Sequence, residues 1–277
     1  MELWKGIVLG MLQGLTEFLP ISSSGHLVIF RYFLGIEEAG VTFGVFLHLA
    51  TLIAVFIAFW EDILGLIKAA FRLFASIFKF RSNALKTLLH NDPYVRLLIL
   101  LLIASLPAGV IGLAFNDLFE ELFNAPLFAG VMLVMTGFIL WFVSKLKEGD
   151  KSPEHISVWD AILIGAAQAI AILPGISRSG STIAGGLLRG LNREDAARFS
   201  FLLSIPVILG ASLFEARNMI YSVELSGGVA LIGGFLSAII FGYIAIKLLL
   251  AVIKKGRLEL FAYYCWLAGV VTVLLIK

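Results

Sequence analysis

The sequence is poor in charge and contains almost no cysteine. Only 14% of its 277 residues are Asp, Glu, Lys or Arg, whereas soluble globular proteins carry about 25%. The single cysteine, Cys265, excludes an internal disulfide and any multi-cysteine metal site. A net charge of +2 leaves no basic domain to neutralise nucleic-acid phosphates, so we expect no nucleic-acid partner.

Apolar residues dominate the rest of the sequence. They make up 60% of the chain, and the mean hydropathy is +1.00. A chain this long and apolar cannot bury its side chains in one soluble core, so membrane lipids must solvate much of its surface. Each of the main apolar runs is close to the ~20 residues that a helix needs to cross a bilayer. These runs cover residues 41–60, 96–115, 126–144, 199–215, 228–250 and 259–276.

Two other apolar stretches, 3–34 and 158–190, are broken in the middle by Pro, Gly and Ser. The first break reads Leu-Pro-Ile-Ser-Ser-Ser-Gly-His over residues 19–26, and the second reads Leu-Pro-Gly-Ile-Ser-Arg-Ser-Gly-Ser-Thr over residues 173–182. Each half-stretch is too short to span a bilayer, and irregular backbone at membrane depth needs protein or a wet cavity to satisfy it. We therefore predict two re-entrant helical hairpins whose tips meet inside the protein.

The segment 61–90 has apolar residues at helical spacing, with Lys68, Arg72 and Lys79 off the apolar stripe. This pattern predicts an amphipathic helix that lies in the membrane interface, and a simple linker is the alternative.

The distribution of charge predicts an orientation. Lysine and arginine gather in residues 61–96, 145–151, 189–198 and 247–257, whereas the connections near 116–121 and 215–224 are mainly acidic. By the positive-inside rule the basic connections are cytoplasmic and the acidic ones external. Six spans then alternate, both termini face outward, and the two hairpins enter from opposite sides.

An internal repeat links the two broken stretches. At an offset of 155 residues, Gly10 aligns with Gly165, and Gln13 with Gln168. The offset also aligns the sequence Ile-Ser-x-Ser-Gly at 21–25 with the same pattern at 176–180. Each hairpin precedes three apolar runs, so we predict an all-α polytopic membrane protein with an inverted-topology repeat. The repeats are 1–150 and 151–277, in one integrated membrane domain; chance identity in Gly- and Ser-rich segments is the alternative.

The first broken stretch carries a carboxylate and an amide on one helix face. Gln13 and Glu17 are four residues apart, and a carboxylate inside a membrane segment points to a partner or a wet site. Their oxygens suit a hard cation such as Mg²⁺ or Ca²⁺. A packing hydrogen bond within the bundle is the alternative.

The serines that follow suggest an anion site. Ser22, Ser23, Ser24 and Gly25 form a small polar turn that opens a helix, whose free N–H groups can hold an anion. His26 lies one turn after Ser23 and could take a proton from Ser23 or from a water, or protonate a leaving group. The serines could instead be helix caps only, with His26 a buried structural residue.

Arg178 is the strongest single signal. An unpaired arginine between apolar segments is costly, and its planar fork matches phosphate oxygens. Hydroxyls of Ser177, Ser179 and Thr182 lie around it in the sequence. A structural pair between Arg178 and Glu17 is the alternative, and it is compatible with a phosphate clamp. His48, a lone histidine on an apolar run, is expected to be structural more often than functional.

These two motifs resemble those of a known family. The run Gln-Gly-Leu-Thr-Glu-Phe-Leu-Pro-Ile-Ser-Ser-Ser-Gly-His at 13–26 resembles the first motif of bacterial undecaprenyl-diphosphate phosphatases, the bacitracin-resistance type. The run Pro-Gly-Ile-Ser-Arg-Ser-Gly-Ser-Thr at 174–182 resembles their second motif. The likeness extends over the whole chain, including its length and its internal repeat.

The resemblance implies an enzyme that removes the terminal phosphate from undecaprenyl diphosphate. This hydrolysis recycles the lipid carrier of peptidoglycan synthesis and gives bacitracin resistance. The resemblance also implies that Ser23 is the nucleophile, His26 the general acid/base and Arg178 the phosphate-binding group, with Glu17 in the acidic motif. The expected substrate contacts are Ser22, Ser24, Gly25, Ser177, Ser179 and Thr182.

The resemblance further implies a divalent cation, Mg²⁺ or Ca²⁺, held by Glu17 and the Gln13 position. The family accepts Glu or Gln at that position, and the Gln here leaves one carboxylate fewer for the cation. The implied location is the bacterial cell (inner) membrane, with a site that opens outward. A covalent phosphoserine and attack by a metal-held water stay open, as do a homo-oligomer and the preferred lipid length.

Transport is the main rival function. Inverted repeats with broken helices are typical of secondary transporters, so the fold could carry an anion or flip the polyprenyl lipid. A Ser23 and His26 couple that faces Arg178 favours the enzyme, because transport alone does not need it. Another membrane phosphatase superfamily has similar short motifs, but its separate lysine motif and second distant histidine are not apparent here.

Overall fold

The computed structural model describes residues 2–34, 41–78, 88, 91–219 and 228–276. Over these residues the chain forms helices joined by turns and short loops, with one isolated bridge between Lys151 and Leu191. The first half contains α1 (Leu3–Phe18), α2 (Ser23–Leu34), α3 (Val41–Ala58), α4 (Trp60–Phe78), α6 (Pro93–Ala114), α7 (Asn116–Leu122) and α8 (Pro126–Ser144). The second half contains the short 3₁₀ helix η1 (Pro153–His155), α9 (Val158–Ile170), α10 (Arg178–Leu188), α11 (Arg193–Met219), α12 (Gly228–Lys254) and α13 (Glu259–Leu275).

The chain is an all-α polytopic membrane protein, as its composition predicts. Four described helices are long and apolar enough to cross a membrane: α6, α8, residues 193–215 of α11, and α12. A fifth span arises if α3 and α4, which meet at a bend of 97°, count as one. By length this is fewer than the six spans expected, because the run 259–276 forms only the 17-residue α13.

The two broken stretches form short helix pairs. α1 and α2 have 16 and 12 residues and are joined by residues 19–22. α9 and α10 have 13 and 11 residues and are joined by residues 171–177. The predicted re-entrant path through a bilayer, the repeat boundaries at residue 150 and the membrane orientation stay predictions.

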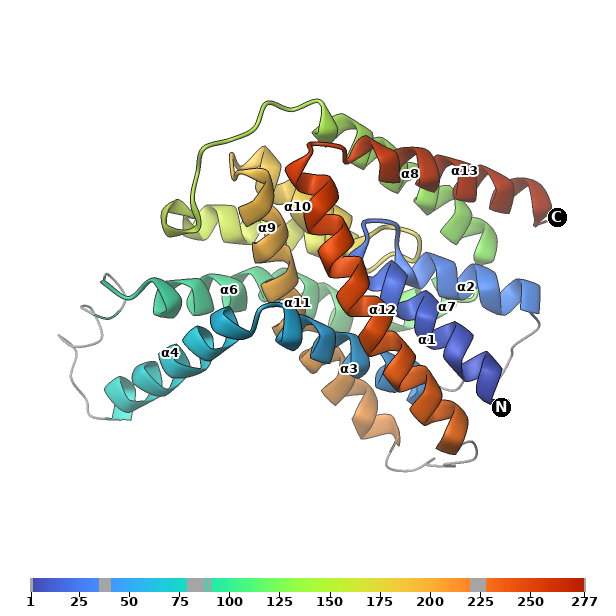
Figure 1. The fold of residues 1–277 in the computed structure, drawn as a ribbon, viewed down its shortest axis with the longest axis horizontal. Coiled ribbons are helices and arrows are strands. Elements are labelled where there is room, and N and C mark those ends of the chain that lie inside the picture. Colours follow the sequence, from blue (N-terminus) through green and yellow to red (C-terminus); the bar gives the residue numbers. More distant parts are fainter. Residues whose placement is uncertain (1, 35–40, 79–87, 89–90, 220–227, 277) are drawn as a thin grey trace.

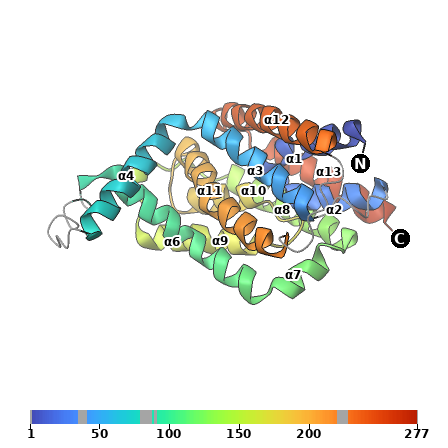
Figure 2. The same cartoon turned by 90° about the horizontal axis from the view of Figure 1, so that it is seen from below.

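Helices of the two halves pack in exchanged pairs. α1 lies along α12, and α9, which is equivalent to α1 at the offset of 155, lies along α6. α3 likewise packs on α12 while α11 packs on α6. Figures 1 and 2 show α12 beside α1, and α8 beside α13 in Figure 1. The halves are therefore intertwined, and neither can bury its hairpin without the other.

Glycines permit the closest of these contacts. A Cβ atom added at Gly10 would overlap the carbonyl oxygen of Gly234, and one at Gly165 would overlap that of Ala104. The aligned glycines of the two hairpins thus serve the same purpose, because only a residue without Cβ lets the backbones approach so far.

The helix starts follow the sequence signals. The carboxylate of Asp92 accepts hydrogen bonds from the backbone N–H groups of Tyr94 and Val95 at 3.1 and 3.2 Å, with Pro93 in the first turn. Pro126 is the first residue of α8, where its missing N–H group costs no helical hydrogen bond. The structure adds a capping box at Ser157 and Asp160 at the start of α9.

α4 has apolar residues on two sides. Ile63, Leu66 and Ala69 are buried, whereas Ile67 and Phe71 are exposed. Figure 1 shows α4 at the end of the molecule opposite both termini. An exposed apolar side suits a helix in contact with lipid, so the interfacial prediction for 61–90 stays a prediction; residues 79–87 and 89–90 of that segment lie outside the described part.

Alanine at Gly10 or Gly165 should destabilise the protein by about 1–3 kcal/mol, because the added methyl group forces tightly packed helices apart. Gly44 and Gly109 are matched controls, since a Cβ at either meets nothing within 4 Å. Alanine there should leave stability unchanged or raise it by up to about 1 kcal/mol. Unfolding of the detergent-solubilised variants measures the difference, and equal stability of all four would contradict the packing argument.

Candidate active site

The tips of the two hairpins meet. The Ser22 hydroxyl donates to the carbonyl oxygen of Ile176 at 3.2 Å, and the Ser179 hydroxyl donates to that of Leu19 at 3.2 Å. A Cβ at Gly25 would lie 2.8 Å from the Cα of Gly175, so the two turns are in direct backbone contact. Residues about 155 positions apart in the sequence therefore form one site.

Each turn caps the helix that follows it by the same pattern. Ser22 Oγ accepts from the N–H of Gly25 at 3.2 Å, and Ser177 Oγ accepts from the N–H of Gly180 at 3.1 Å. Each of these oxygens also lies 3.2 Å from the hydroxyl oxygen of the serine two residues later, Ser24 in the first turn and Ser179 in the second. The capping that the sequence offered as an alternative role is thus present in both turns.

Ser22 adopts a left-handed backbone conformation, with φ of 66°. A residue with a Cβ rarely holds this conformation without compensation. Here the Ser22 side chain bonds both its own turn and the opposite one, and these contacts compensate for the strain. The turn is therefore held in a shape that presents the start of α2 to the second hairpin.

Glu17 is the centre of the site. Its side chain is only 5% exposed, and its Oε1 accepts from Arg178 Nη2 at 2.5 Å. Its Oε2 accepts from Gln13 Nε2 at 2.9 Å and from Ser23 Oγ at 2.8 Å. The expected pair between Glu17 and Arg178 is present, and it joins the two hairpins through a buried charge-assisted bond.

Ser23 and Arg178 begin α2 and α10, and they are equivalent at the offset of 155. The N-terminal ends of two helices therefore open onto the same region. The side chains of Ser22 and Ser177 cap one N–H group at each start, and the other N–H groups of the first turn have no partner within the helix and lie at the positive end of its dipole. Such an arrangement attracts an anion, and the guanidinium of Arg178 adds a full positive charge to it.

His26 is buried, and both of its ring nitrogens have partners. Nδ1 lies 2.8 Å from the carbonyl oxygen of Ser22, and Nε2 lies 2.7 Å from the hydroxyl of Tyr264 in α13. The Ser23 hydroxyl is bonded to Glu17, so the direct hydrogen bond in this structure couples the serine to the carboxylate. The sequence had not indicated Tyr264, because a tyrosine in an apolar run looks like an ordinary membrane aromatic residue.

His48 comes to the site from α3. Its Nδ1 lies 3.0 Å from Gln13 Nε2 and 3.5 Å from Glu17 Oε2. The sequence treated His48 as structural more often than functional, since an isolated histidine gives no indication of its tertiary neighbours. Only the packing of α3 against α1 brings it beside the carboxylate.

The other predicted substrate contacts of the second hairpin are Ser177, Ser179 and Thr182, and their hydroxyls are already hydrogen-bonded to other groups of the protein. Thr182 Oγ1 donates to the carbonyl oxygen of Arg178 at 2.9 Å and lies 2.6 Å from Ser200 Oγ. Thr136 of α8 donates to the carbonyl oxygen of Gly175 and accepts from the N–H of Ser177. A direct role of Ser177, Ser179 and Thr182 in substrate binding stays a prediction.

One observation bears on a cation. The Oε1 atom of Gln13 is buried without a hydrogen-bond partner, next to Glu17. An unsatisfied carbonyl oxygen beside a carboxylate matches the oxygen ligands of Mg²⁺ and Ca²⁺, so these two residues fit the expected group. Among the described residues there is no cluster of three or more His, Cys, Asp or Glu that could hold a metal by itself.

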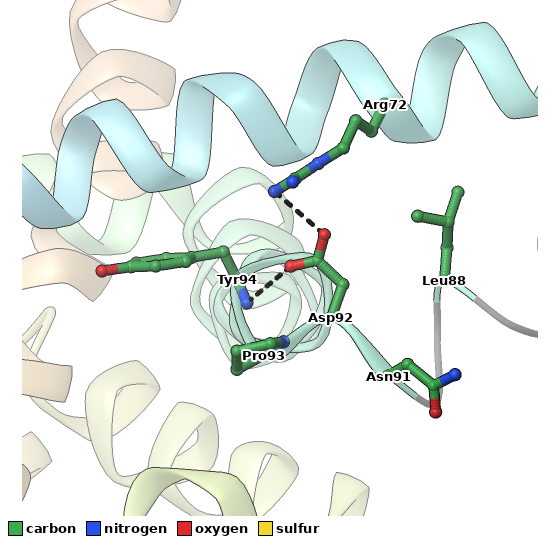
Figure 3. A pocket seen from close by; sticks show the side chains of 6 residues that line it. All are labelled: Arg72, Leu88, Asn91, Asp92, Pro93 and Tyr94. Atoms are coloured by element: carbon green, nitrogen blue, oxygen red, sulfur yellow. Dashed lines mark hydrogen bonds and ion pairs between the residues drawn. The ribbon is translucent and has the colours of Figure 1, made fainter.

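Two cavities lie away from the hairpin tips. One, of about 420 Å³, lies where the start of α6 faces α4 and is lined by Arg72, Asp92 and Tyr94 among others (Figure 3). Arg72 is paired with Asp92 at 2.9 Å there. The other, of about 210 Å³, is lined by residues of α6, α11 and the segment around η1. Neither lining includes Glu17, Ser23, His26 or Arg178.

Comparison with known proteins identifies a family and several relatives. The family described as "Bacitracin resistance protein BacA" matches residues 6–271. An undecaprenyl-diphosphatase of Methanosphaera stadtmanae is 43% identical over 277 residues, covering 99% of this chain and 98% of the relative. One of Halothermothrix orenii is 44% identical over 276 residues, with the same coverage. Undecaprenyl-diphosphatase 4 of Bacillus thuringiensis is 40% identical over 272 residues, covering 98% of this chain and 96% of the relative. The chain belongs to the bacitracin resistance protein BacA family.

Proposed function

We propose that this chain hydrolyses undecaprenyl diphosphate to undecaprenyl phosphate and inorganic phosphate. The hydrolysis recycles the lipid carrier of peptidoglycan synthesis and underlies bacitracin resistance. The observation that carries the proposal is that Ser23, Glu17 and Arg178 lie in one chain of hydrogen bonds. In the proposal Ser23 is the nucleophile, Glu17 accepts its proton and Arg178 binds the phosphate.

Arg178 and the two helix starts bind the terminal phosphate. A diphosphate carries several negative charges, and in a site poor in water fixed positive groups offset them more strongly than solvent does. The bond of Arg178 to Glu17 engages Oε1 through Nη2. The guanidinium has five N–H donors in all, which leaves it able to bind phosphate oxygens while Glu17 orients it.

Ser23 attacks the terminal phosphorus. Its hydroxyl donates to Glu17 Oε2, which takes the proton as the bond from Ser23 Oγ to phosphorus forms. The bond from phosphorus to the bridging oxygen breaks, and its electron pair leaves with undecaprenyl phosphate. Water then attacks the phosphorus and the bond from phosphorus to Ser23 Oγ breaks, which releases inorganic phosphate carrying the oxygen and protons of the water. Glu17 returns its proton to Ser23 Oγ. In the alternative route Glu17 takes the proton from a water that attacks phosphorus directly.

His26 acts on the water or on the leaving group. It lies one helical turn from Ser23 and is buried. Because Nδ1 is bonded to the Ser22 carbonyl oxygen, Nε2 is the nitrogen that exchanges the proton, and to do so it gives up its bond to the Tyr264 hydroxyl for one to the water or the leaving group. The Nδ1 atom of His48 accepts a hydrogen bond from Gln13 Nε2, and this bond helps to orient the Gln13 amide toward Glu17.

A divalent cation, Mg²⁺ or Ca²⁺, would be held by Glu17 and the carbonyl oxygen of Gln13. When bound, it would neutralise part of the charge that builds up on the phosphate oxygens. The support for this assignment is the unpartnered Oε1 of Gln13 beside Glu17.

The polyprenyl tail stays in contact with the bilayer. Exposed aliphatic side chains cover the outer surfaces of the helices, among them Leu267 and Leu274 of α13. The cell membrane is the proposed location, with a site that opens outward, as the resemblance to the family implies.

Alanine at Ser23 or at Arg178 should each lower phosphate release from a polyprenyl diphosphate by at least ~100-fold, the scale for losing a key catalytic group. Ser144→Ala is the matched control, because the Ser144 hydroxyl donates to the carbonyl oxygen of Trp141 in its own helix. Release is measured in detergent at matched folding, with and without EDTA.

The outcomes separate the alternatives. Release that survives Ser23→Ala but vanishes with EDTA would transfer the nucleophile role to a water. No release from the wild type under any condition would overturn the enzyme proposal and favour transport or flipping of the lipid.

Gln13→Glu should lower the Mg²⁺ concentration needed for half-maximal activity, by about tenfold. A second carboxylate beside Glu17 repels the first unless a cation is bound, so the variant gains cation affinity. Titration of EDTA-treated enzyme with Mg²⁺ measures the change against the wild type. An unchanged requirement would remove Gln13 from the proposed cation site.

A further inference from the structure

The bond between His26 and Tyr264 joins a site residue of the first half to the last helix of the second half. The Nε2 and Oη atoms are 2.7 Å apart, and the two rings are nearly parallel at 9°, with centroids 5.6 Å apart. The neighbouring Cys265 contacts the same hairpin, with its Sγ 3.7 Å from the carbonyl oxygen of Pro20. α13 is thus in register with the first hairpin tip at two adjacent positions.

The partners of His26 determine which nitrogen carries its proton. Nδ1 faces the carbonyl oxygen of Ser22, which can only accept, so Nδ1 must be the donor. In the neutral ring Nε2 is then the acceptor, and the Tyr264 hydroxyl must donate to it. One phenol therefore selects a single tautomer of the histidine and holds its orientation.

The two residues differ sharply in exposure. His26 is 4% exposed, whereas Tyr264 is 43% exposed. A buried imidazole without a partner at Nε2 would lose a hydrogen bond that water could not easily replace. Tyr264 is therefore the more exposed end of a hydrogen-bonded chain that runs through His26 to the backbone of Ser22, at the start of the proposed active-site turn.

We propose that Tyr264 is a positioning residue for the phosphatase reaction, which holds His26 through Nε2 in the tautomer protonated on Nδ1. The inference rests on the proposed function, since it assigns Tyr264 a role through His26. Removal of the hydroxyl frees Nε2 and lets the ring change its tautomer and orientation. The expected loss is in the chemical step and not in substrate binding.

The test compares Tyr264→Phe with Tyr263→Phe. Tyr263 is the adjacent tyrosine of α13, 52% exposed, and its ring contacts Trp266 at 5.9 Å. Tyr264→Phe should lower kcat for phosphate release by about 10-fold with KM unchanged, a part of what general acid/base catalysis contributes. Tyr263→Phe should leave both constants at wild-type values.

A double-mutant cycle with His26→Gln tests whether Tyr264 acts through His26. The loss caused by Tyr264→Phe should disappear in the His26→Gln background, because the residue it acts through is already gone. Equal losses in both backgrounds, or a loss of thermal stability that accounts for the lower activity, would overturn the proposal and make Tyr264 a packing residue.

A second readout does not depend on activity. In protein labelled with ¹⁵N-histidine, the ring nitrogens of His26, assigned with His26→Gln, should show the proton on Nδ1 in the wild type and a mixture of tautomers in Tyr264→Phe. A wild-type proton on Nε2 would overturn the inference while leaving the proposed phosphatase intact. A wild type without phosphate release would overturn the phosphatase and this role together.

Discussion

The buried ion pair between Glu17 and Arg178 is the interaction on which the site depends. Each charge is in a segment surrounded by apolar sequence, and leaving either unpaired at membrane depth would cost several kcal/mol. The pair therefore keeps the two hairpins together, and it also orients the arginine toward an incoming anion. The same carboxylate accepts the hydrogen bond of Ser23. The carboxylate of Glu17 thus serves both the structural pair with Arg178 and the proposed catalysis, and the sequence analysis had found these two roles of Arg178 compatible.

The packing around this pair explains why the tips can meet. Irregular backbone is tolerated inside a membrane protein when other segments satisfy its polar groups. Here the serines of each turn bond the opposite turn, and Thr136 supports the second one. Glycines at equivalent places let α1 approach α12 and α9 approach α6. Because each hairpin packs against a helix of the other half, the geometry of the tips depends on the whole chain.

The turns of the two hairpins share one capping pattern, but they carry different side chains at the positions proposed for catalysis. Ser22 and Ser177 cap their helices in the same way. At the next position one half has Ser23 and the other Arg178, so the nucleophile candidate and the phosphate-binding cation occupy equivalent places. At the same offset, Glu17 aligns in the sequence with Ile172, and His26 aligns with Ser181. The two equivalent turns thus supply two helix starts that attract an anion, and the differing side chains divide the proposed reaction between them.

The sequence by itself determined the class of protein, the two interrupted helices and most residues of the site. Composition, hydropathy and turn residues are local properties, and the cost of Glu17 and Arg178 in apolar segments already required a partner for each. Only the tertiary structure decided which groups bond. It connected Ser23 to Glu17, brought His48 to the same carboxylate and placed Tyr264 on His26. The bond from Tyr264 to His26 joins residues 238 positions apart in different halves, and the other two contacts depend on how α1, α2 and α3 pack within the first half. No local pattern encodes these contacts, because they arise from the packing of separate helices.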